Sequence, residues 1–400
     1  MTLQFFWCAF YLKGYVIEKI MQYSEEMIND LLQISDYTPA VFAVKDSYQI
    51  MLPVHTPCTF WVRVGDIEYY DDSNGILRSD TPIHRVSVPV EELDRAGGYT
   101  VYWQIVEERK PYFPRMKPVA EQTFRFRPLP EKEIRIYQIA DAHGRGESAI
   151  ADAEFFVREK GGLDLLILNG DVIDHGGKTE NFMIYYEIAT ALTKGEFPVI
   201  VSRGNHDLRG QAAEKLADFT PGENGNSYYS FRLGSLWGMV LDCGEDKIDG
   251  HPEYGNTVRC HAFRERENEY FKSIVANAKN EYAADGVKHR IVVSHVPFNH
   301  INVAPFDIEQ AMYKEWVERL NRDVKPDLML CGHIHDAFIT MPGDAYSDFD
   351  TKFPVVVGSK TDFDRQYYVG CGVVLKDDEI EVSFNDVQSF INETHLPFVK

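Results

Sequence analysis

Residues 197–208 read FPVIVSRGNHDL, an apolar run rich in β-branched residues that stops abruptly at polar side chains. The run predicts a buried strand, and Gly204 allows the backbone to turn tightly where that strand ends. Asn205, His206 and Asp207 follow at once, and side chains of these kinds bind metals or move protons. Taken alone, GNHD also fits an ordinary turn, so its meaning depends on the rest of the chain.

Apolar strands alternate with helical segments from Ile134 onward. Three strand patterns, RIYQIAD, LDLLILNGD and FPVIVSRGNHD, are each followed by a helical pattern, near 147–160, 179–194 and 210–219. RIVVSHVP, a helical pattern near 307–323 and DLMLCGHIH come later. This alternation predicts an α/β sheet with helices on both faces. In such sheets, functional side chains collect at the carboxyl ends of the strands.

Five of these strands end in potential ligands. In chain order the ends carry Asp141 and His143, Asp171 and Asp174, Asn205 with His206 and Asp207, His295, and His333 with His335. Each short motif is weak alone, because Asp and His are common in loops and helix caps. Five such ends, in order along one edge of a sheet, are hard to obtain by chance.

This set resembles the calcineurin-like metallophosphoesterase superfamily, whose motifs DxH, GDxxD, GNHD, a lone His and GHxH all stand between residues 133 and 385. The resemblance implies a four-layer αββα domain over residues 131–400, with two β-sheets flanked by helices. It also implies two metal ions. Asp141, His143 and His335 would hold the first, Asn205, His295 and His333 the second, and Asp171 both. Oxygen and imidazole ligands without thiolate suit Mn, Fe, Zn or Co.

The resemblance further implies hydrolysis of phosphate esters, with a hydroxide that bridges the metals as nucleophile. In this family pattern His206 is not a ligand and acts as general acid near the leaving group. Asp207 would accept a hydrogen bond from the His206 ring and keep that ring protonated. The alternative for Asp207 is a cap on the helix expected from Gly210.

Other polar residues are expected at the rim of the site. Arg203 and His300 are candidates for contact with the phosphate, and His175 is a third candidate for the substrate. For each, a solvated loop residue or a partner of a ligand is the plainer interpretation. Asp174 is a candidate to hold the second ring nitrogen of a metal-bound histidine. Cys331 is interpreted as a core residue.

Residues 37–130 have a different texture, with short β-rich runs such as TFWVRVGDIEYY and GYTVYWQIVEE between turn signals. This texture predicts an immunoglobulin-like β-sandwich, joined by the linker PLPEKE, 128–133. A β-rich part at this place resembles the N-terminal domain of purple acid phosphatases. Those enzymes ligate iron with the Tyr of a GDxxY motif. Position 174 is Asp here, so we expect no tyrosinate–iron colour.

Residues 1–36 are expected to form a helical arm that packs on the body of the protein. No Lys or Arg precedes the apolar start, and no clean cleavage site follows it. The apolar run is too short to span a bilayer. A poor secretion signal, a membrane-facing arm and a natural start at Met21 stay open as alternatives.

The formal net charge of −21 argues against binding to a nucleic-acid backbone. Six scattered cysteines without a CxxC pair fit reduced thiols and a cytoplasmic location. We expect a phosphorylated small molecule as the substrate and no stable insertion into a membrane. The oligomeric state is left open.

Two questions about function stay open. The motifs do not separate phosphomonoesters from phosphodiesters, and the segment near 245–288 is a candidate lid or substrate wall. The second class of function is a partner- or glycan-binding protein whose metal domain is a scaffold without turnover. Trp61, Tyr69, Tyr70 and Trp103 would suit a carbohydrate face, although aromatic residues at such positions more often form the core.

Overall fold

A computed structural model describes residues 30–300, 303–345, 347–362 and 367–398. Most of the expected arm, residues 1–29, lies outside this range, as does the choice between Met1 and Met21. The described part begins with a 3-10 turn at Leu31–Gln33. None of the helices in these ranges is long and apolar enough to cross a membrane.

Sheet A is a large mixed sheet that contains the first three strands predicted after Ile134. Its strand order is β23-β22-β21-β11-β12-β13-β1-β2-β7, and β20 also pairs with β21. The central strands β11, β12 and β13 are parallel, whereas β21 to β23 are antiparallel. The bounds along this part are β11 (Ile134–Ile139), β12 (Leu165–Asn169), β13 (Val199–Ser202), β20 (Lys360–Asp362), β21 (Tyr367–Leu375), β22 (Glu379–Asn385) and β23 (Phe390–Pro397).

Sheet B has the strand order β14-β15-β16-β17-β19-β18 and contains the two later predicted strands. Strands β15, β16, β17 and β19 run parallel. The bounds are β14 (Tyr229–Leu233), β15 (Leu236–Leu241), β16 (His289–Ser294), β17 (Leu328–Cys331), β18 (Phe338–Thr340) and β19 (Val355–Val357).

Alternation along the strands explains why the two sheets pack face to face. Leu165 and Ile167 share a core with Ile291 of the other sheet, whereas Leu166 and Leu168 point into a second core. Side chains two residues apart share a face of a strand, so each strand contributes to two cores. The outer cores are closed by α3 (Gly146–Lys160) and α4 (Ile184–Thr193) on sheet A, and by α6 (Cys260–Ala276) and α7 (Gln310–Arg319) on sheet B.

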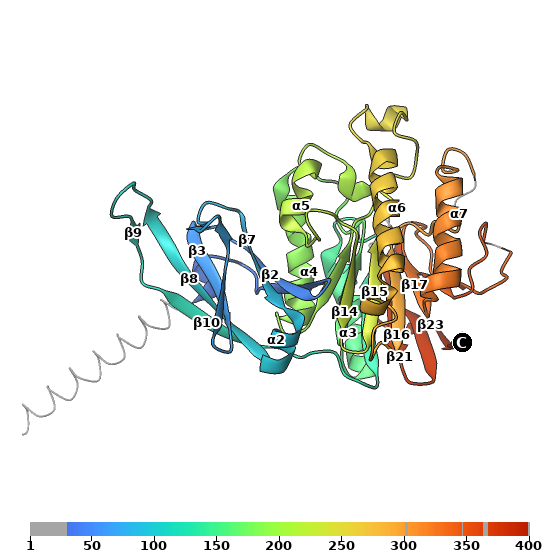
Figure 1. The fold of residues 1–400 in the computed structure, drawn as a ribbon, viewed down its shortest axis with the longest axis horizontal. Helices are drawn as coiled ribbons and strands as arrows, with labels where there is room; N and C mark the ends of the chain where they lie inside the picture. Colours follow the sequence, from blue (N-terminus) through green and yellow to red (C-terminus); the bar gives the residue numbers. More distant parts are fainter. Residues whose placement is uncertain (1–29, 301–302, 346, 363–366, 399–400) are drawn as a thin grey trace, which may run out of the picture.

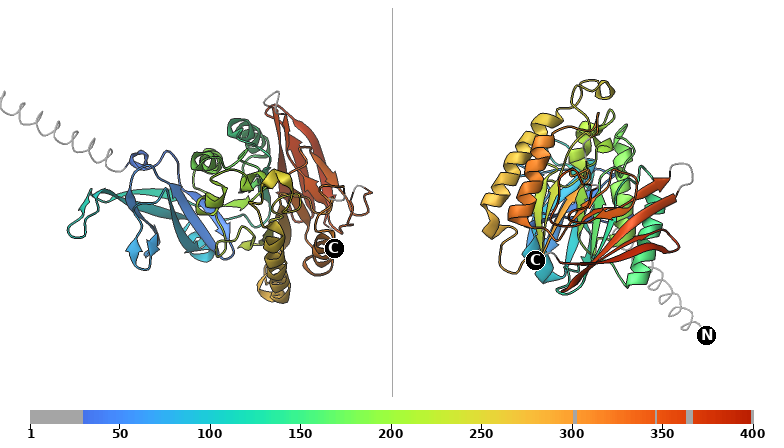
Figure 2. Two further views of the ribbon diagram at one scale, coloured as in Figure 1. Left: turned by 90° about the horizontal axis from the view of Figure 1, so that it is seen from above. Right: turned by 90° about the vertical axis from the view of Figure 1, so that its right-hand side faces the viewer.

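The result is a four-layer arrangement of helix, sheet, sheet and helix. The green helices α3 and α4 lie on one side of the two sheets, and the gold and orange helices α6 and α7 on the other (Figure 2, left). Figure 1 shows sheet A continuing toward the β-rich N-terminal part.

The N-terminal part is built from an antiparallel sheet C and an extension of sheet A. Sheet C has the order β10-β8-β3-β4, with β9 paired to β8, and faces β1, β2 and β7 across a shared apolar core. The strands are β1 (Ala40–Val44), β2 (Ser47–Pro53), β3 (Cys58–Val64), β4 (Ile67–Tyr70), β7 (Ile83–Pro89), β8 (Gly98–Glu108), β9 (Arg115–Met116) and β10 (Ala120–Arg125). Strands β5 (Asp72–Ser73) and β6 (Ile76–Leu77) form a hairpin, and helix α2 (Val90–Ala96) leads into β8.

The sandwich expected over 37–130 is therefore not a self-contained unit. Strand β1 pairs in parallel with β13, with Phe42 opposite Val199, so one layer of the sandwich is a continuation of sheet A. The segment 128–133, expected as a linker, joins two parts that already share this sheet. A local pattern could not reveal the pairing, because it joins strands far apart in the sequence.

Candidate metal centre

The five predicted strand ends meet at one edge of the two sheets. Five of the seven expected ligands have left-handed backbone conformations: Asp141 (φ 52°), His143 (φ 46°), Asp171 (φ 48°), His333 (φ 73°) and His335 (φ 55°). Such a conformation costs a residue with a side chain about 1–3 kcal/mol, and strain of this kind clusters at functional sites. The strained turns direct the side chains of the strand ends toward one another.

Asp141, His143 and His335 form the first group of potential ligands. One ligand atom from each lies within 4.8 Å of the others. His143 Nε2 is 3.0 Å from His335 Nε2, which is 3.4 Å from Asp141 Oδ1. Burial lowers the pKa of His143 to about 4, so the ring is neutral near pH 7, as a metal ligand must be.

Asp174 lies behind this first group, as the sequence suggested. Its Oδ1 is 3.5 Å from Nδ1 of His143. A carboxylate at the second ring nitrogen fixes the orientation of a ligating imidazole and raises its basicity. The contact leaves Nε2 of His143 directed toward His335.

Asp171, His295 and His333 form the second group, again with ligand atoms within 4.8 Å of one another. His295 Nδ1 lies 2.7 Å from the carbonyl oxygen of Asn169, which can only accept a hydrogen bond. The proton therefore sits on Nδ1, and Nε2 faces Asp171 Oδ2 at 3.2 Å. This is the arrangement expected of an imidazole that ligates through Nε2.

Asn205 borders the second group. Its Oδ1 lies 3.0 Å from His333 Nδ1, and its side chain is buried. In the opposite amide orientation the nitrogen would donate to His333 and to Asp171, and the oxygen would accept from Arg209. A bound cation favours the first orientation because it draws the amide oxygen and the ring nitrogen toward the same point.

Asp171 lies between the two groups. Its carboxylate also lies within 4.8 Å of ligand atoms of His143 and His206, as well as of His295 and His333. Burial raises the pKa of this carboxyl, but the nearby His295, His206 and His143 lower it by more than burial raises it. The net shift of the pKa is therefore downward. An ionised carboxylate placed in this way suits a bridge between two metal ions.

The residues present fit a pair of cations. Asp141 Oδ1 and His295 Nε2 are buried beside His335 and Asp171, yet within the described ranges neither atom makes a well-aligned hydrogen bond. Burial opposes a charge on His295, but Asp171 and Asp141 raise its pKa to about 10. A protonated His295 thus supplies the positive charge that a metal ion would otherwise bring to these carboxylates.

Residues 134–337, just over half of the chain, match the calcineurin-like phosphoesterase family. The chain belongs to this family. The family match, together with the clustered Asp and His ligands, supports a dimetal site whose metals are not identified.

Solved structures extend this likeness to the N-terminal part. A purple acid phosphatase from seeds of yellow lupin (Lupinus luteus) is 10% identical, with a TM-score of 0.57, and the alignment covers 90% of this chain and 74% of that one. This confirms the fold expected from the second resemblance, with a β-rich part before the phosphoesterase core.

Two other solved structures align with a smaller share of the chain. A dimetal phosphatase from Danio rerio is 12% identical with a TM-score of 0.47, covering 68% of this chain and 99% of that one. GAP50 of Plasmodium is 16% identical with a TM-score of 0.44, covering 67% and 90%. No curated protein sequence matches the chain.

His206 of the phosphoesterase motif GNHD reaches the same centre. Its Nδ1 lies 2.9 Å from the carbonyl oxygen of Asp174, so this nitrogen carries the proton and Nε2 is left for other contacts. Its backbone N–H donates to Asp171 Oδ1 at 2.8 Å. The ring packs edge-on against His143, with centroids 4.7 Å apart.

Gly204 is required here for a different reason from the one expected. An added Cβ would lie 2.2 Å from Asp171 Oδ1 and 2.4 Å from the Asp171 backbone nitrogen. The two strand ends therefore approach too closely for any side chain. Close approach of the backbone, and not a special turn, explains the glycine.

Asp207 does not hold the His206 ring, which corrects the expectation from the sequence. Its buried Oδ2 accepts from the backbone N–H groups of Gly204, at 2.7 Å, and Asp171, at 3.2 Å. Asp207 does not cap the helix expected near 210–219 either. That segment forms only short turns and the single-turn helix α5 (Leu216–Phe219). Asp207 therefore ties together the two strand ends that carry Asp171 and Asn205.

The three expected substrate contacts are not all brought to the centre. Arg203 forms an ion pair of 2.7 Å with Asp242, and its guanidinium lies over the Phe263 ring. His300 lies beside Thr340 and Phe338. His175 is exposed next to Asp174, 3.8 Å from its carboxylate, which in turn lies beside the His143 ring.

Sequence reasoning missed two residues that contact the predicted site. Asp246 Oδ2 lies 3.8 Å from His333 Nε2, and Arg209 Nη1 lies 3.2 Å from His206 Nε2. Arg209 is held by two hydrogen bonds of 2.9 Å to the buried Glu245. The sequence does hold a signal for Asp246 and for Glu245, the partner of Arg209: LWGMVL at 236–241 reads as a strand, and the acidic segment DCGED follows it directly.

Cys331 behaves as the core residue that was expected. Its side chain is fully buried, and burial raises its pKa well above the usual range, so the thiol stays protonated. The other described cysteines, Cys58, Cys243, Cys260 and Cys371, are also buried and free.

Proposed function

We propose that this phosphoesterase is an active hydrolase of phosphate esters that uses two transition-metal ions, of Mn, Fe or Zn. The observation that carries the proposal is the two groups of potential ligands, each with its atoms within 4.8 Å, together with the place of Asp171, which belongs to the second group and also lies within 4.8 Å of His143 of the first. Structural ion-pair networks do not require two such groups of imidazoles around buried carboxylates. Two bound ions would activate a water molecule for attack and neutralise the charge that builds on the phosphate.

The chain's own residues supply the remaining steps. Asp171 aligns both halves of the site, and Asp174 and the Asn169 carbonyl orient the rings of His143 and His295. To act as the acid, His206 must carry a proton on each ring nitrogen: Nδ1–H is held by the Asp174 carbonyl, and the proton on Nε2 passes to the leaving oxygen. Arg209, next to Nε2, adds a fixed positive charge on the same side.

A phosphorylated small molecule is the proposed substrate. The alternative of a glycan-binding protein without turnover has weaker support. Trp103 lies in the core, and Trp61 stacks between Tyr102, at 5.3 Å, and Tyr70, at 6.1 Å. These rings cover one another's faces, and a sugar would need such a face to be free.

The test is turnover of p-nitrophenyl phosphate and bis-p-nitrophenyl phosphate by the full chain loaded with Mn²⁺. We expect release of p-nitrophenol that depends on added metal, and the ratio of the two rates reports the preference for monoesters or diesters. Confirmed metal binding with no turnover of these esters or of a wider ester panel would refute the proposal.

A further inference from the structure

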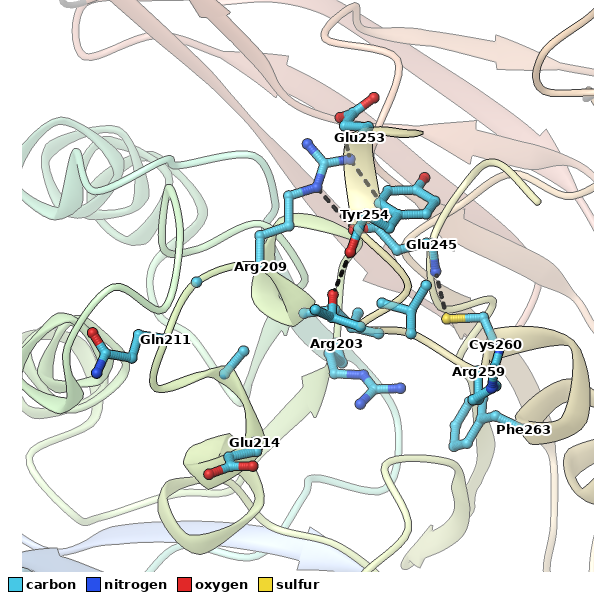
Figure 3. Close-up of a pocket in the computed structure, with 15 residues that line it drawn as sticks. Arg203, Arg209, Gln211, Glu214, Glu245, Glu253, Tyr254, Arg259, Cys260 and Phe263 are labelled. Carbon is cyan, nitrogen blue, oxygen red and sulfur yellow. Dashed lines mark hydrogen bonds and ion pairs between the residues drawn. The ribbon is translucent and has the colours of Figure 1, made fainter. Parts of the chain in front are cut away.

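A cavity of about 750 Å³ lies beside the candidate metal centre. One wall is the chain that follows the GNHD motif, from Leu208 to Glu214, and the other is the segment from Glu245 to Phe263. The volume is in the range of about 300–1,000 Å³ that is usual for small-molecule sites. Figure 3 shows Gln211 and Glu214 on one side of this space and Arg259, Cys260 and Phe263 on the other.

Arg209 connects this cavity to the reacting centre. It lines the cavity, and its Nη1 lies 3.2 Å from Nε2 of His206, the atom proposed to meet the leaving oxygen. The adjoining residues Glu245 and Asp246 make the same connection from the other wall. Glu245 lines the cavity, and Asp246 lies 3.8 Å from His333 Nε2. The cavity therefore opens next to the place from which an alcohol would depart.

The walls of the cavity are held in place by buried contacts. Arg264 is almost fully buried and donates to the carbonyl oxygens of Cys243, at 2.7 Å, and Glu245, at 3.2 Å. The Tyr254 hydroxyl donates to Asp246 Oδ1 at 2.8 Å. Walls that are fixed before binding lose little freedom when a ligand enters.

The lining combines apolar side chains, among them Leu208, Val258 and Phe263, with six charged ones that balance in sign: arginines 203, 209 and 259 and glutamates 214, 245 and 253. Asp242 pairs with Arg203, while Glu245 and Glu253 pair with Arg209. By contrast, Gln211, Glu214 and Arg259 make no side-chain hydrogen bond or ion pair within the described parts of the chain. These three groups are available to a ligand.

We propose that this cavity is the subsite for the alcohol part of the ester, and that it takes an alcohol rich in hydroxyl groups, such as a sugar. Glu214 can only accept hydrogen bonds, Arg259 can only donate them, and Gln211 does both. Hydroxyl groups satisfy all three, whereas an apolar alcohol would remove water from them without replacement. Glu214 and Arg259 balance each other in charge, so the cavity favours neither an anionic nor a cationic alcohol.

The proposal rests on the proposed ester hydrolysis, and its test compares two esters of primary alcohols. Glucose 6-phosphate offers hydroxyl groups, and benzyl phosphate is similar in size but lacks them. We expect the Mn²⁺-loaded full chain to show a kcat/KM at least tenfold higher for the sugar ester. The variants Arg259→Ala and Glu214→Gln should each lower this selectivity ratio by about tenfold, the effect of one charged hydrogen bond.

Arg266→Ala is the matched control, since Arg266 lies on the same helix as Cys260 but does not line the cavity. It should keep the selectivity ratio of the parent. Equal use of the two esters by the parent, or an equal loss for both esters in the variants, would overturn the proposal.

Failure of the proposed function can be told apart from failure of the subsite. If no ester is hydrolysed, binding of glucose 6-phosphate to the metal-loaded chain is measured by calorimetry. Binding that is lost in Arg259→Ala and kept in Arg266→Ala would support the subsite without catalysis. Absence of binding would overturn it.

Discussion

Asp171 is the residue on which both halves of the candidate site depend. Its carboxylate lies near His295 and His333 on one side and near His143 and His206 on the other, and it also accepts the backbone N–H of His206. Loss of its charge would therefore disturb both metals. His206 contacts the same centre without being an expected ligand, so the two residues should fail in different ways when they are replaced.

The variant His206→Ala should keep both metals and lose about 10²–10⁴-fold in kcat, the usual contribution of a positioned acid. The loss should grow as the leaving alcohol becomes less acidic, because a poorer leaving group needs its proton more. The measurement is kcat over a series of aryl and alkyl phosphates, with metal content determined in parallel. Asp171→Asn is the comparison, and equal metal loss in the two variants would contradict the assigned roles.

Metal binding should release a proton from His295. The carboxylates of Asp171 and Asp141 raise the pKa of this ring to about 10 in the metal-free chain, above the value of about 6.5 for a free histidine. The ring is thus protonated at pH 7.5 and must lose its proton to ligate. Calorimetry in two buffers of different ionisation enthalpy should show release of about one proton. No difference between the buffers would contradict a ligand role for His295.

The clustering of the candidate ligands could be predicted at this scale because each follows a strand directly and the five motifs keep their order. The partner of Asp207 could not be predicted in the same way. Its hydrogen bond to the backbone N–H of Asp171 joins two loops that only the folded sheet brings together. Arg209 was missed for a similar reason, since its partner Glu245 comes from another strand end.

At the scale of elements, the close approach of the loops after β12 and β13 is the feature that assembles the centre. Asp207 links these loops through backbone hydrogen bonds, and Gly204 leaves no room between them. These loops carry Asp171, the expected bridge between the two metals, and Asn205, so a small separation of the two strand ends would move both residues.

Gly204→Ala should therefore weaken metal binding by tenfold or more and lower stability by about 1–3 kcal/mol, as overpacking of a tight site does. Its added Cβ would lie 2.2 Å from Asp171 Oδ1. Gly250→Ala is the control, because a Cβ there would meet nothing within 4 Å. Metal titration and thermal unfolding of both variants check this, and equal behaviour of the two would contradict the role given to Gly204.

Helix α3 carries a buried acid that should make stability depend on pH. Burial, and next the charge of Asp386, raise the pKa of Asp152 to about 8, and its Oδ2 has no hydrogen-bond partner within the described residues. The unfolded value is about 3.9. Stability from the protonated acid is thus fully present below pH 4 and is lost as the pH rises toward 8.

Asp152→Asn removes this ionisation and should raise the free energy of unfolding at pH 8.5 by about 1–2 kcal/mol. Near pH 5 the change should be small. Thermal unfolding of the parent and the variant across this pH range is the measurement, and a constant difference between them would contradict the account of Asp152.

The strands themselves could be predicted from the sequence, but not all of their pairings, for physical reasons. Strands β11, β12, β13, β16 and β17 are buried apolar runs with polar ends, which a local pattern reveals. Strand β1 also reads as a strand, but its parallel pairing with β13 depends on Phe42 meeting Val199. Contacts between such distant residues leave no local signal, so the shared sheet was missed.

At the scale of the whole molecule, a net charge of −21 would repel the anionic substrate of a phosphoesterase. The candidate site itself adds carboxylates, with Asp141 and Asp171 buried at its centre. Two metal ions would reverse this charge where the phosphate binds. Activity should therefore be absent from the metal-free chain and not merely reduced.

The most direct test of this account is a titration of the metal-free chain with Mn²⁺, in which bound metal and hydrolysis of p-nitrophenyl phosphate and bis-p-nitrophenyl phosphate are followed together. The account predicts two ions per chain, with turnover of at least one ester appearing as the second ion binds. Saturation at a single ion, or two bound ions without hydrolysis of either ester, would contradict it.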